Sequence, residues 1–508
     1  MRNIFKATLI VTIFSVLTRG LGFILRIILS RNLGAEMLGS YQISMSILGV
    51  LMTIIASGIP LVISRTVAYN KSINQENSAY STTTAGLVIT LTISCLITLL
   101  LYLFPDLLNF LSGNNYTKNI ILLALPSLIF SAIYCVLRSA LWGDKHFFAI
   151  SFTEFFEQVV RIICCFILFT LPIFPNLSMG EKASLSLTFA CLLSAILVIA
   201  VYFSLKQKIS SPKGAIKPLL KSSSSITALR TVSSIVSSLI SIIIPVRLMK
   251  YGFSSSEAIA QYGMIMGMAF PLIMIPSTLI GSVAVTLIPE ISSKTDNIDD
   301  ASKTHNLGGL KNNILTGINV SILISMIFVP SFIVLGEPIC NILYGSSTAG
   351  KYVSVGAILM LPVGINQITS SILNSIGLEF KSLINYVFGA AALILSILFL
   401  PKYIGTYALI VGYSFMSIIS AILNLRMLKK RNLLKKGYFK FIIQSIFFAM
   451  FSVLIGKFTY NIISLFLSEF LSTLLCGILT TACMVSLYLC FKVSDIKGFV
   501  VKRLKRKQ

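Results

Sequence analysis

The chain has 508 residues, of which 56% are hydrophobic and 11% are charged, whereas soluble domains contain about 45–50% apolar and about 25% charged residues. A mean hydropathy of +0.91 over this length is more than soluble cores can bury, which excludes a soluble enzyme, a disordered protein and a disulfide scaffold. The net charge of +25 does not indicate nucleic-acid binding, because the basic residues lie in short clusters between apolar runs. The composition predicts an all-α protein that crosses a membrane several times.

A membrane-spanning helix needs about 20 mostly apolar residues. The sequence contains fourteen stretches of this kind. They cover residues 7–29, 42–65, 82–104, 119–141, 148–171, 185–205, 224–246, 263–288, 313–335, 353–375, 382–400, 404–426, 440–461 and 468–491. The first stretch is predicted to be a span rather than a signal peptide, because it continues through two arginines and no small-residue cleavage motif follows it.

The distribution of lysine and arginine predicts the orientation. With the N-terminus in the cytoplasm, 29 of the 41 basic residues fall on the cytoplasmic side, eight fall in outer loops and four fall inside spans. The largest cytoplasmic clusters are 206–221, 426–440 and 492–507. Because basic residues concentrate in cytoplasmic loops, we predict a multi-pass protein of the cell membrane with both termini in the cytoplasm.

The chain is predicted to divide into two lobes of six spans. Residues 210–223 contain two prolines and the beginning of a serine run, a composition typical of a linker. This linker would separate an N-terminal lobe, residues 1–209, from a C-terminal lobe, residues 224–430. Residues 431–508 would add two further spans and a basic cytoplasmic tail.

An internal repeat supports this division. Four residues of the segment 27–41 recur in the same order in the segment 243–262. The pairs are Arg31 and Arg247, Gly34 and Gly252, Glu36 and Glu257, and Tyr41 and Tyr262. Six spans separate the copies, so both run in the same direction. Parallel six-helix repeats are typical of transporters that bind substrate between their halves.

Two arginines lie inside the first span. Arg19 and Arg26 are seven residues apart, which places them on nearly the same helical face, about 10 Å apart along the axis. An arginine in the middle of a span needs a polar cavity or a partner. Two guanidinium groups without an acid in the same span suit an anion such as a pyrophosphate. The alternative is a structural pair whose side chains bond helix carbonyls or extend to the membrane surface.

Further charges lie inside or at the ends of spans. Glu154, Glu157 and Arg161 share one stripe of the fifth span, either as a locally neutralised group or as a polar patch of a substrate cavity, where a carboxylate could exchange a proton or cation. Arg65 and Arg230 lie near span ends, where the charged head can extend to the surface or can line the same cavity.

Two other patterns predict helix geometry. Pro271 and Pro276 lie in one span and predict a bent helix. Gly263 and Gly267 are four residues apart, a spacing that favours close packing against a neighbouring helix.

No motif indicates a cofactor, a metal or a nucleotide. The segment from Gly345 to Tyr352 resembles a phosphate-binding loop, but tyrosine replaces the magnesium-binding hydroxyl and no strand precedes it. The nine cysteines do not have the spacing of metal ligands. The chain has two histidines, and they lie too far apart in sequence to form a two-histidine zinc motif. We predict no cofactor, no bound metal and no enzymatic activity.

Several segments resemble one known family. The opening TRGLGFILRIILSRNLGAEMLGSY, SGIPLVIS at 57–64, EQVVR at 157–161, the block 257–292 and ILYGSSTAG at 342–350 are similar to the stage V sporulation protein B group. That group belongs to the multidrug, oligosaccharidyl-lipid and polysaccharide exporter superfamily, together with lipid II flippases and multidrug extruders. The resemblance covers most of the chain.

The resemblance implies a fourteen-helix fold with two six-helix lobes around a central cavity. It implies a flippase that moves a lipid-linked anionic glycan, such as a peptidoglycan precursor for the spore cortex, across the cytoplasmic membrane by alternating access. Arg19 matches the arginine that precedes Leu-Gly-Phe in the family, Arg26 follows it two turns later, and Glu157 with Arg161 matches the Glu-Gln…Arg element. Membrane lipids are the implied surroundings, and cell-wall synthesis proteins are potential partners.

The sequence departs from this family at its ion site. Sodium-coupled relatives carry acids in the C-terminal lobe, whereas the spans 224–246, 382–400 and 404–426 contain none. Coupling to sodium, to protons or to the membrane potential therefore stays open. Two other functions also stay open: a cation-coupled multidrug extruder and an integral membrane enzyme of glycan assembly.

Overall fold

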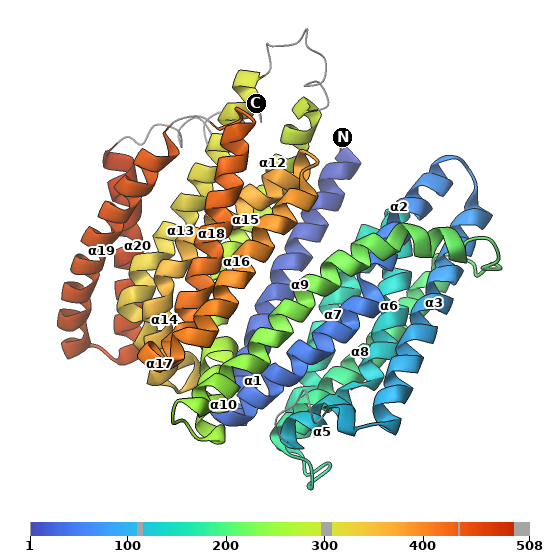
Figure 1. Ribbon diagram of the computed structural model, residues 1–508, viewed down its shortest axis with the longest axis horizontal. Coiled ribbons are helices and arrows are strands. Elements are labelled where there is room, and N and C mark those ends of the chain that lie inside the picture. Colours follow the sequence, from blue (N-terminus) through green and yellow to red (C-terminus); the bar gives the residue numbers. More distant parts are fainter. Residues whose placement is uncertain (1, 109–114, 296–306, 435–436, 492–508) are drawn as a thin grey trace. The chain divides into compact units, whose positions relative to one another are not determined.

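The computed structural model describes residues 2–108, 115–295, 307–434 and 437–491. All regular structure in these ranges is helical, as the composition predicts (Figure 1). Contacts between Cα atoms divide the chain into two compact units. The first unit comprises Met1–Met249 and Phe253–Gly263, and the second comprises Lys250–Gly252 and Met264–Gln508.

The first unit contains nine described helices. They are α1 (Arg2–Ala56), α2 (Gly58–Ser72), α3 (Glu76–Leu103), α5 (Asn115–Ala124), α6 (Pro126–Gly143), α7 (Phe147–Thr170), α8 (Met179–Ser204), α9 (Ile216–Lys250) and α10 (Ser255–Gly263). The unit therefore extends past the predicted linker at 210–223, because α9 and α10 pack with the first six spans. The predicted lobe boundaries, which rest on the repeat, stay a prediction.

The second unit contains the remaining described helices. They are the π-helix η1 (Met264–Ala269), α11 (Phe270–Ile273), α12 (Ile275–Thr295), α13 (Leu307–Tyr344), α14 (Ser347–Gly356), the 3₁₀ turn η3 (Ala357–Leu359), α15 (Met360–Ser375), α16 (Glu379–Phe399), α17 (Pro401–Ile404), the 3₁₀ turn η4 (Gly405–Tyr407), α18 (Ala408–Lys430), α19 (Tyr438–Phe466) and α20 (Glu469–Cys490).

The number of membrane spans differs from the predicted fourteen. By length and composition, the described residues contain 11 helices able to cross a membrane, or up to 12 if a bent pair forms one span. One of the 11 is Ile10–Ser72, whose 63 residues would extend about 95 Å if straight, about three times the hydrocarbon thickness. Helix α7 is not among them and carries three charges, Glu154, Glu157 and Arg161. The protein is a multi-pass membrane protein, and the number fourteen stays a prediction.

The break inside α1 explains how that long helix can form two spans. Gly34 has φ 71° and ψ 176°, outside the helical region, and only glycine adopts such a backbone conformation without steric cost. Its counterpart in the predicted repeat, Gly252, also has a positive φ, 101°. Tyr41 and Tyr262, which follow these glycines in the two copies, are each 3% exposed. Backbone conformation and burial thus agree between the two segments.

The two copies of the repeat contact each other within the first unit. A Cβ atom on Gly39 of α1 would lie 2.1 Å from the carbonyl oxygen of Ile259 in α10, and one on Gly263 would lie 2.2 Å from the carbonyl oxygen of Ala35. No side chain fits in either place. The prediction that Gly263 lies at a close helix contact is therefore confirmed.

The predicted bend at Pro271 and Pro276 is also present. The helical segments Ser255–Ile273 and Ile275–Ala284 meet at an angle of 45°. The six-residue π-helix η1 directly precedes α11, so a π-bulge and two prolines combine to interrupt the α-helical hydrogen bonding.

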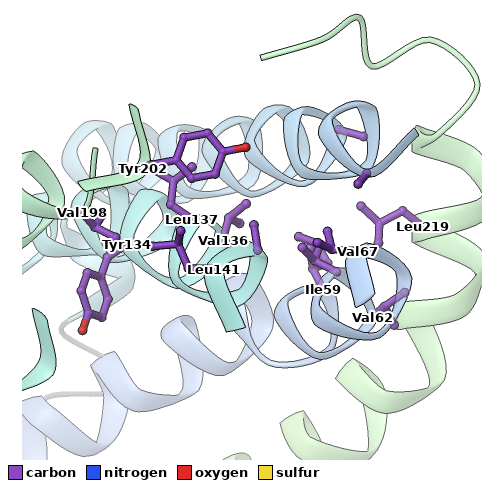
Figure 2. Packing of buried hydrophobic residues seen from close by; sticks show 14 of the residues in the cluster. Ile59, Val62, Val67, Tyr134, Val136, Leu137, Leu141, Val198, Tyr202 and Leu219 are labelled. Atoms are coloured by element: carbon purple, nitrogen blue, oxygen red, sulfur yellow. The ribbon is translucent and has the colours of Figure 1, made fainter. Parts of the chain in front are cut away.

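A buried apolar cluster holds α2, α3, α6, α8 and the start of α9 together. Its members include Ile63, Val136 and Leu141, which are fully buried, and Leu219 at the beginning of α9 (Figure 2). Lipid tails are as apolar as these side chains, so helix association here depends on close packing rather than on the exclusion of water. Leu219 fixes the first turn of α9 to this cluster.

Candidate substrate-binding site

The first candidate element is the pair Arg19 and Arg26 on α1. Both side chains are exposed, while Leu25 and Leu29 on the same helix are buried at 4% exposure. An α-helix turns by about 100° per residue, so two residues seven apart point in directions that differ by about 20°. Arg19 and Arg26 therefore project from nearly the same side of α1. A Cβ on Gly22, between them in sequence, would lie 3.8 Å from Oε1 of Gln158 on α7. The arginine pair therefore lies on a helix that packs along α7.

Aromatic contacts fix that packing at the start of α1. The ring of Phe14 meets the rings of Phe148 and Phe155 on α7 edge-on, each at a centroid distance of 5.8 Å. Edge-to-face pairs have a preferred geometry, so they restrict how α1 can rotate against α7. This orientation decides in which direction Arg19 and Arg26 point.

The second candidate element is a charged cluster on α6 and α7. Arg138 of α6 forms an ion pair from Nη2 to Oε1 of Glu154 on α7, with 30% and 38% of the two side chains exposed. The guanidinium group of Arg138 also lies 6.0 Å from the ring centre of Tyr134. Glu154 is therefore neutralised from another helix, not from its own, which sequence spacing alone does not indicate.

Arg161 has a different partner from the one that the helix spacing predicts. Its Nη2 donates a hydrogen bond of 2.7 Å to the hydroxyl oxygen of Tyr41 on α1. No ion pair within 4 Å joins Arg161 to Glu157 among the described residues, although the two are one turn apart on α7. This region therefore contains two arginines, Arg138 and Arg161, and two glutamates. Glu154 forms an ion pair with Arg138, and Glu157 forms none among the described residues.

The remaining predicted site residues, Arg65 and Arg230, lie on other helices. Arg65 is exposed on α2. Arg230 on α9 donates from Nη1 to the carbonyl oxygen of Ser57, at 3.2 Å, where the chain breaks between α1 and α2. This contact joins α9 to the junction of α1 and α2, where Ser57 is the N-cap of α2.

Arg138 was not among the site residues predicted from the sequence. It lies within α6, between Leu137 and Ser139, and reaches Glu154 across the α6–α7 interface. Its position inside the predicted span 119–141 was the available signal.

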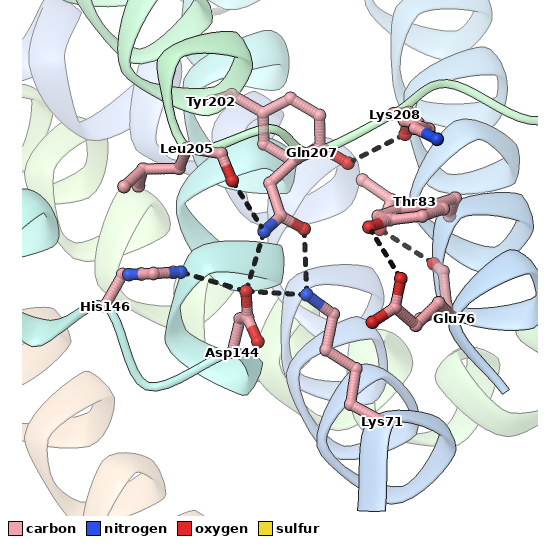
Figure 3. A network of polar contacts seen from close by, with 11 residues as sticks. Lys71, Glu76, Thr83, Asp144, His146, Tyr202, Leu205, Gln207 and Lys208 are labelled. Carbon is pink, nitrogen blue, oxygen red and sulfur yellow. Dashed lines mark hydrogen bonds and ion pairs between the residues drawn. The ribbon is translucent and has the colours of Figure 1, made fainter. Parts of the chain in front are cut away.

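A second polar network lies at one end of the first unit (Figure 3). Lys71 forms an ion pair of 2.6 Å with Asp144, which also contacts Nε2 of His146 at 3.0 Å. Gln207 donates from Nε2 to Asp144 at 2.7 Å and accepts from Nζ of Lys71 at 3.0 Å. The three segments that meet here follow the second, fourth and sixth predicted spans. Because successive spans alternate in direction, segments that follow even-numbered spans lie on the same side of the membrane. The network is consistent with this arrangement.

The segment from Gly345 to Tyr352 does not have the strand–loop–helix arrangement of a phosphate-binding loop. The helix α13 precedes it, and residues from Ser347 onward form α14, with Ser346 accepting a hydrogen bond from the backbone N–H of Ala349. All nine cysteines are unpaired thiols.

Comparison with known proteins identifies the family. A family described as polysaccharide biosynthesis protein matches residues 4–295. This range covers more than half of the chain. The chain belongs to the polysaccharide biosynthesis protein family.

Two curated proteins of Bacillus subtilis (strain 168) are similar to the chain. Stage V sporulation protein B is 24% identical over 396 residues, which cover 76% of this chain and 75% of the relative. Sporulation protein YkvU is 22% identical over 315 residues, covering 58% of this chain and 66% of the relative. The resemblance seen in the sequence is confirmed.

Solved structures show the same fold. A lipid II flippase, MurJ, in an inward closed conformation has a TM-score of 0.68 at 16% identity, covering 94% of this chain and 98% of its own. An inward-facing multidrug resistance transporter of the MATE family has a TM-score of 0.63 at 14% identity, covering 80% and 92%. The chain has the helical fold of these transport proteins.

Proposed function

We propose that the protein is a flippase that translocates a lipid-linked anionic glycan, a peptidoglycan precursor, across the cytoplasmic membrane. Its membership of the polysaccharide biosynthesis family and its flippase-like fold support a transported glycan. The similarity to two sporulation proteins favours a role in the spore cortex.

The observation that carries this proposal is the exposed pair Arg19 and Arg26. Guanidinium groups bind phosphate oxygens through paired hydrogen bonds, and two of them on one face can hold a pyrophosphate. The first acidic residue of the chain is Glu36, beyond the break at Gly34, so the α1 segment that carries the pair has a formal charge of only one sign. Such a surface attracts anions and repels cations.

The two six-helix lobes would alternate access to the bound headgroup from either side of the membrane. In this proposal Glu154, Glu157, Arg161 and Arg65 line the cavity, and Arg230 adds positive potential near it. The driving force is either an ion exchanged at a carboxylate such as Glu157 or the membrane potential acting on the charge of the substrate.

A flipping assay tests the proposal. Purified protein in liposomes that contain labelled lipid II should move the label across the bilayer, and Arg19→Ala or Arg26→Ala should reduce the rate far more than the membrane abundance. Arg→Lys should rescue only partly, because lysine keeps the charge but loses the paired hydrogen bonds. Normal transport by both alanine variants would contradict the assigned role of the pair.

A multidrug extruder is the alternative function, since the fold is also that of a MATE transporter. An extruder of cations would lose little activity when Arg19 and Arg26 are replaced. It would be inhibited by replacement of Glu157, because a cationic drug needs a carboxylate partner. The same liposomes, loaded with a cationic dye, distinguish the two functions.

A further inference from the structure

A cavity of about 320 Å³ lies at the end of the first unit where α2, α3 and the start of α9 meet. Its volume is at the lower limit of the range of about 300–1,000 Å³ typical of small-molecule sites. The floor is buried and includes Asn70, Thr82 and Leu219, whereas Lys213, Gly214 and Ser222 at the rim are exposed. A ligand could therefore enter from outside and reach buried polar groups.

The lining offers hydrogen-bond donors and no carboxylate. Seven of the twelve lining residues carry polar side chains, and Lys213 is the charged one. The hydroxyls of Thr66 and Ser222 donate to no acceptor among the described residues. Ser78 accepts a hydrogen bond from Nδ2 of Asn70 at 3.1 Å, which leaves its own hydroxyl hydrogen available.

Two other hydroxyls are already used to hold the chain in place. Ser81 donates to the carbonyl of Ser211 at 2.7 Å, and the backbone N–H of Ser210 donates to Oγ1 of Thr84 at 3.2 Å. These contacts tie the segment before α9 to α3. Gly214 has φ +88°, a conformation that glycine adopts without strain, and it directs the chain from Lys213 into α9.

The segment that supplies Lys213 to the cavity is basic. Residues 206–221 contain five lysines, and no aspartate or glutamate occurs from 182 to 256. The acid nearest in sequence to a lining residue is Glu76, two residues before Ser78, and it accepts a hydrogen bond from the hydroxyl of Tyr80 at 3.4 Å. Lys71, next to Asn70, is neutralised by Asp144. A ligand with negative charge is therefore favoured over a cation.

We propose that this cavity binds a phosphate group, with Lys213 as its charged contact and the hydroxyls of Thr66, Ser78 and Ser222 as donors. The phosphate can belong to an anionic phospholipid headgroup or to a free phosphate in water. The site is separate from Arg19 and Arg26, so it does not depend on the proposed transport function. Binding would fix the start of α9 against α2 and α3.

The test uses the full-length protein in neutral detergent. One arm measures binding of radiolabelled inorganic phosphate by equilibrium dialysis, and the other counts bound phosphatidylglycerol by native mass spectrometry, with diacylglycerol as the phosphate-free control lipid. Lys213→Gln and Ser222→Ala together should weaken binding about tenfold, since a charge-assisted contact and a donor are lost. Both side chains are exposed, so this variant should fold.

The matched control is Lys217→Gln with Ser224→Ala, which removes a lysine and a hydroxyl of the same segment that do not line the cavity. It should bind within about twofold of the unmodified protein. Binding in the dialysis arm alone identifies a free phosphate as the ligand, and binding in the lipid arm alone identifies a headgroup. No saturable binding in either arm, or an equal loss in the control variant, would overturn the proposal. In a protein that already carries Arg19→Ala and Arg26→Ala, Lys213→Gln with Ser222→Ala should still weaken the remaining binding about tenfold.

Discussion

Arg161 of α7 donates a hydrogen bond to the hydroxyl of Tyr41 on α1, 120 positions earlier in the chain. Tyr41 is 3% exposed and belongs to the first copy of the internal repeat. The contact therefore connects the segment after the break at Gly34 with the helix that carries Glu154 and Glu157. It makes the charged stripe of α7 part of the packing of the first unit.

Tyr41→Phe should destabilise the first unit by about 1–3 kcal/mol, because a guanidinium nitrogen loses its acceptor. Thermal unfolding in detergent measures the effect. Tyr69→Phe is the control, since Tyr69 is 64% exposed on α2. Equal midpoints for the two variants would show that the Arg161–Tyr41 bond contributes nothing to stability.

Arg138→Gln and Glu154→Gln should each destabilise the protein more than the double variant does, because each single change leaves one charge without its partner. The side chains are 30% and 38% exposed, so water screens the remaining charge and reduces the cost below the about 3–5 kcal/mol of a fully buried pair. A double-mutant cycle on unfolding midpoints measures the coupling. Additive effects of the two changes would show that the ion pair is not coupled energetically.

Gly39→Ala should prevent correct packing of α10 on α1, because the new Cβ would lie 2.1 Å from the carbonyl oxygen of Ile259, and backbone cannot move aside cheaply. Gly49→Ala is the matched control on the same helix, where nothing lies within 4 Å of the added atom. Membrane abundance and unfolding midpoint should fall strongly for the first variant only. Normal abundance and stability of Gly39→Ala would contradict the close α1–α10 approach.

Reporter fusions that end after residues 75, 145 and 210 should all indicate the same side, the cytoplasm, because Lys71, Asp144 and Gln207 lie in one network. A fusion that ends at residue 175, between α7 and α8, should indicate the opposite side. An outer location for the first three would reverse the predicted topology. A mixed result among those three would contradict the alternation of spans.

Asp144→Asn should loosen the end of the first unit, since Asp144 accepts from both Lys71 and Gln207 and contacts His146. Trp142 is the single tryptophan of the chain and lies two residues away, with its ring 5.5 Å from that of Phe147. Its fluorescence should therefore change in Asp144→Asn. Asp106→Asn is the control. Asp106 forms an ion pair with Lys118, has 87% of its side chain exposed and lies far from Trp142 in sequence.

The sequence determined the class of protein and the place of its helices. Backbone groups inside a bilayer must bond within their own segment, so long apolar runs become helices whatever surrounds them, and each predicted span falls on helix in the described residues. The prolines at 271 and 276 and the glycine at 263 also act locally, so the bend and the close contact followed from the sequence. The positive φ at both Gly34 and Gly252 agrees with the predicted repeat.

Tertiary structure alone decided the partners of the charged side chains. Helical spacing paired Glu157 with Arg161, but α1 packs on α7 so that Tyr41 reaches Arg161, and α6 supplies Arg138 to Glu154. These contacts join residues on different helices. The periodicity of a single sequence shows which residues share a face of one helix, but not how that helix is rotated against its neighbour. The cavity beside Lys213 arises in the same way, from the meeting of α2, α3 and α9, whose lining residues are separated by up to 160 positions from Val62 to Ser222.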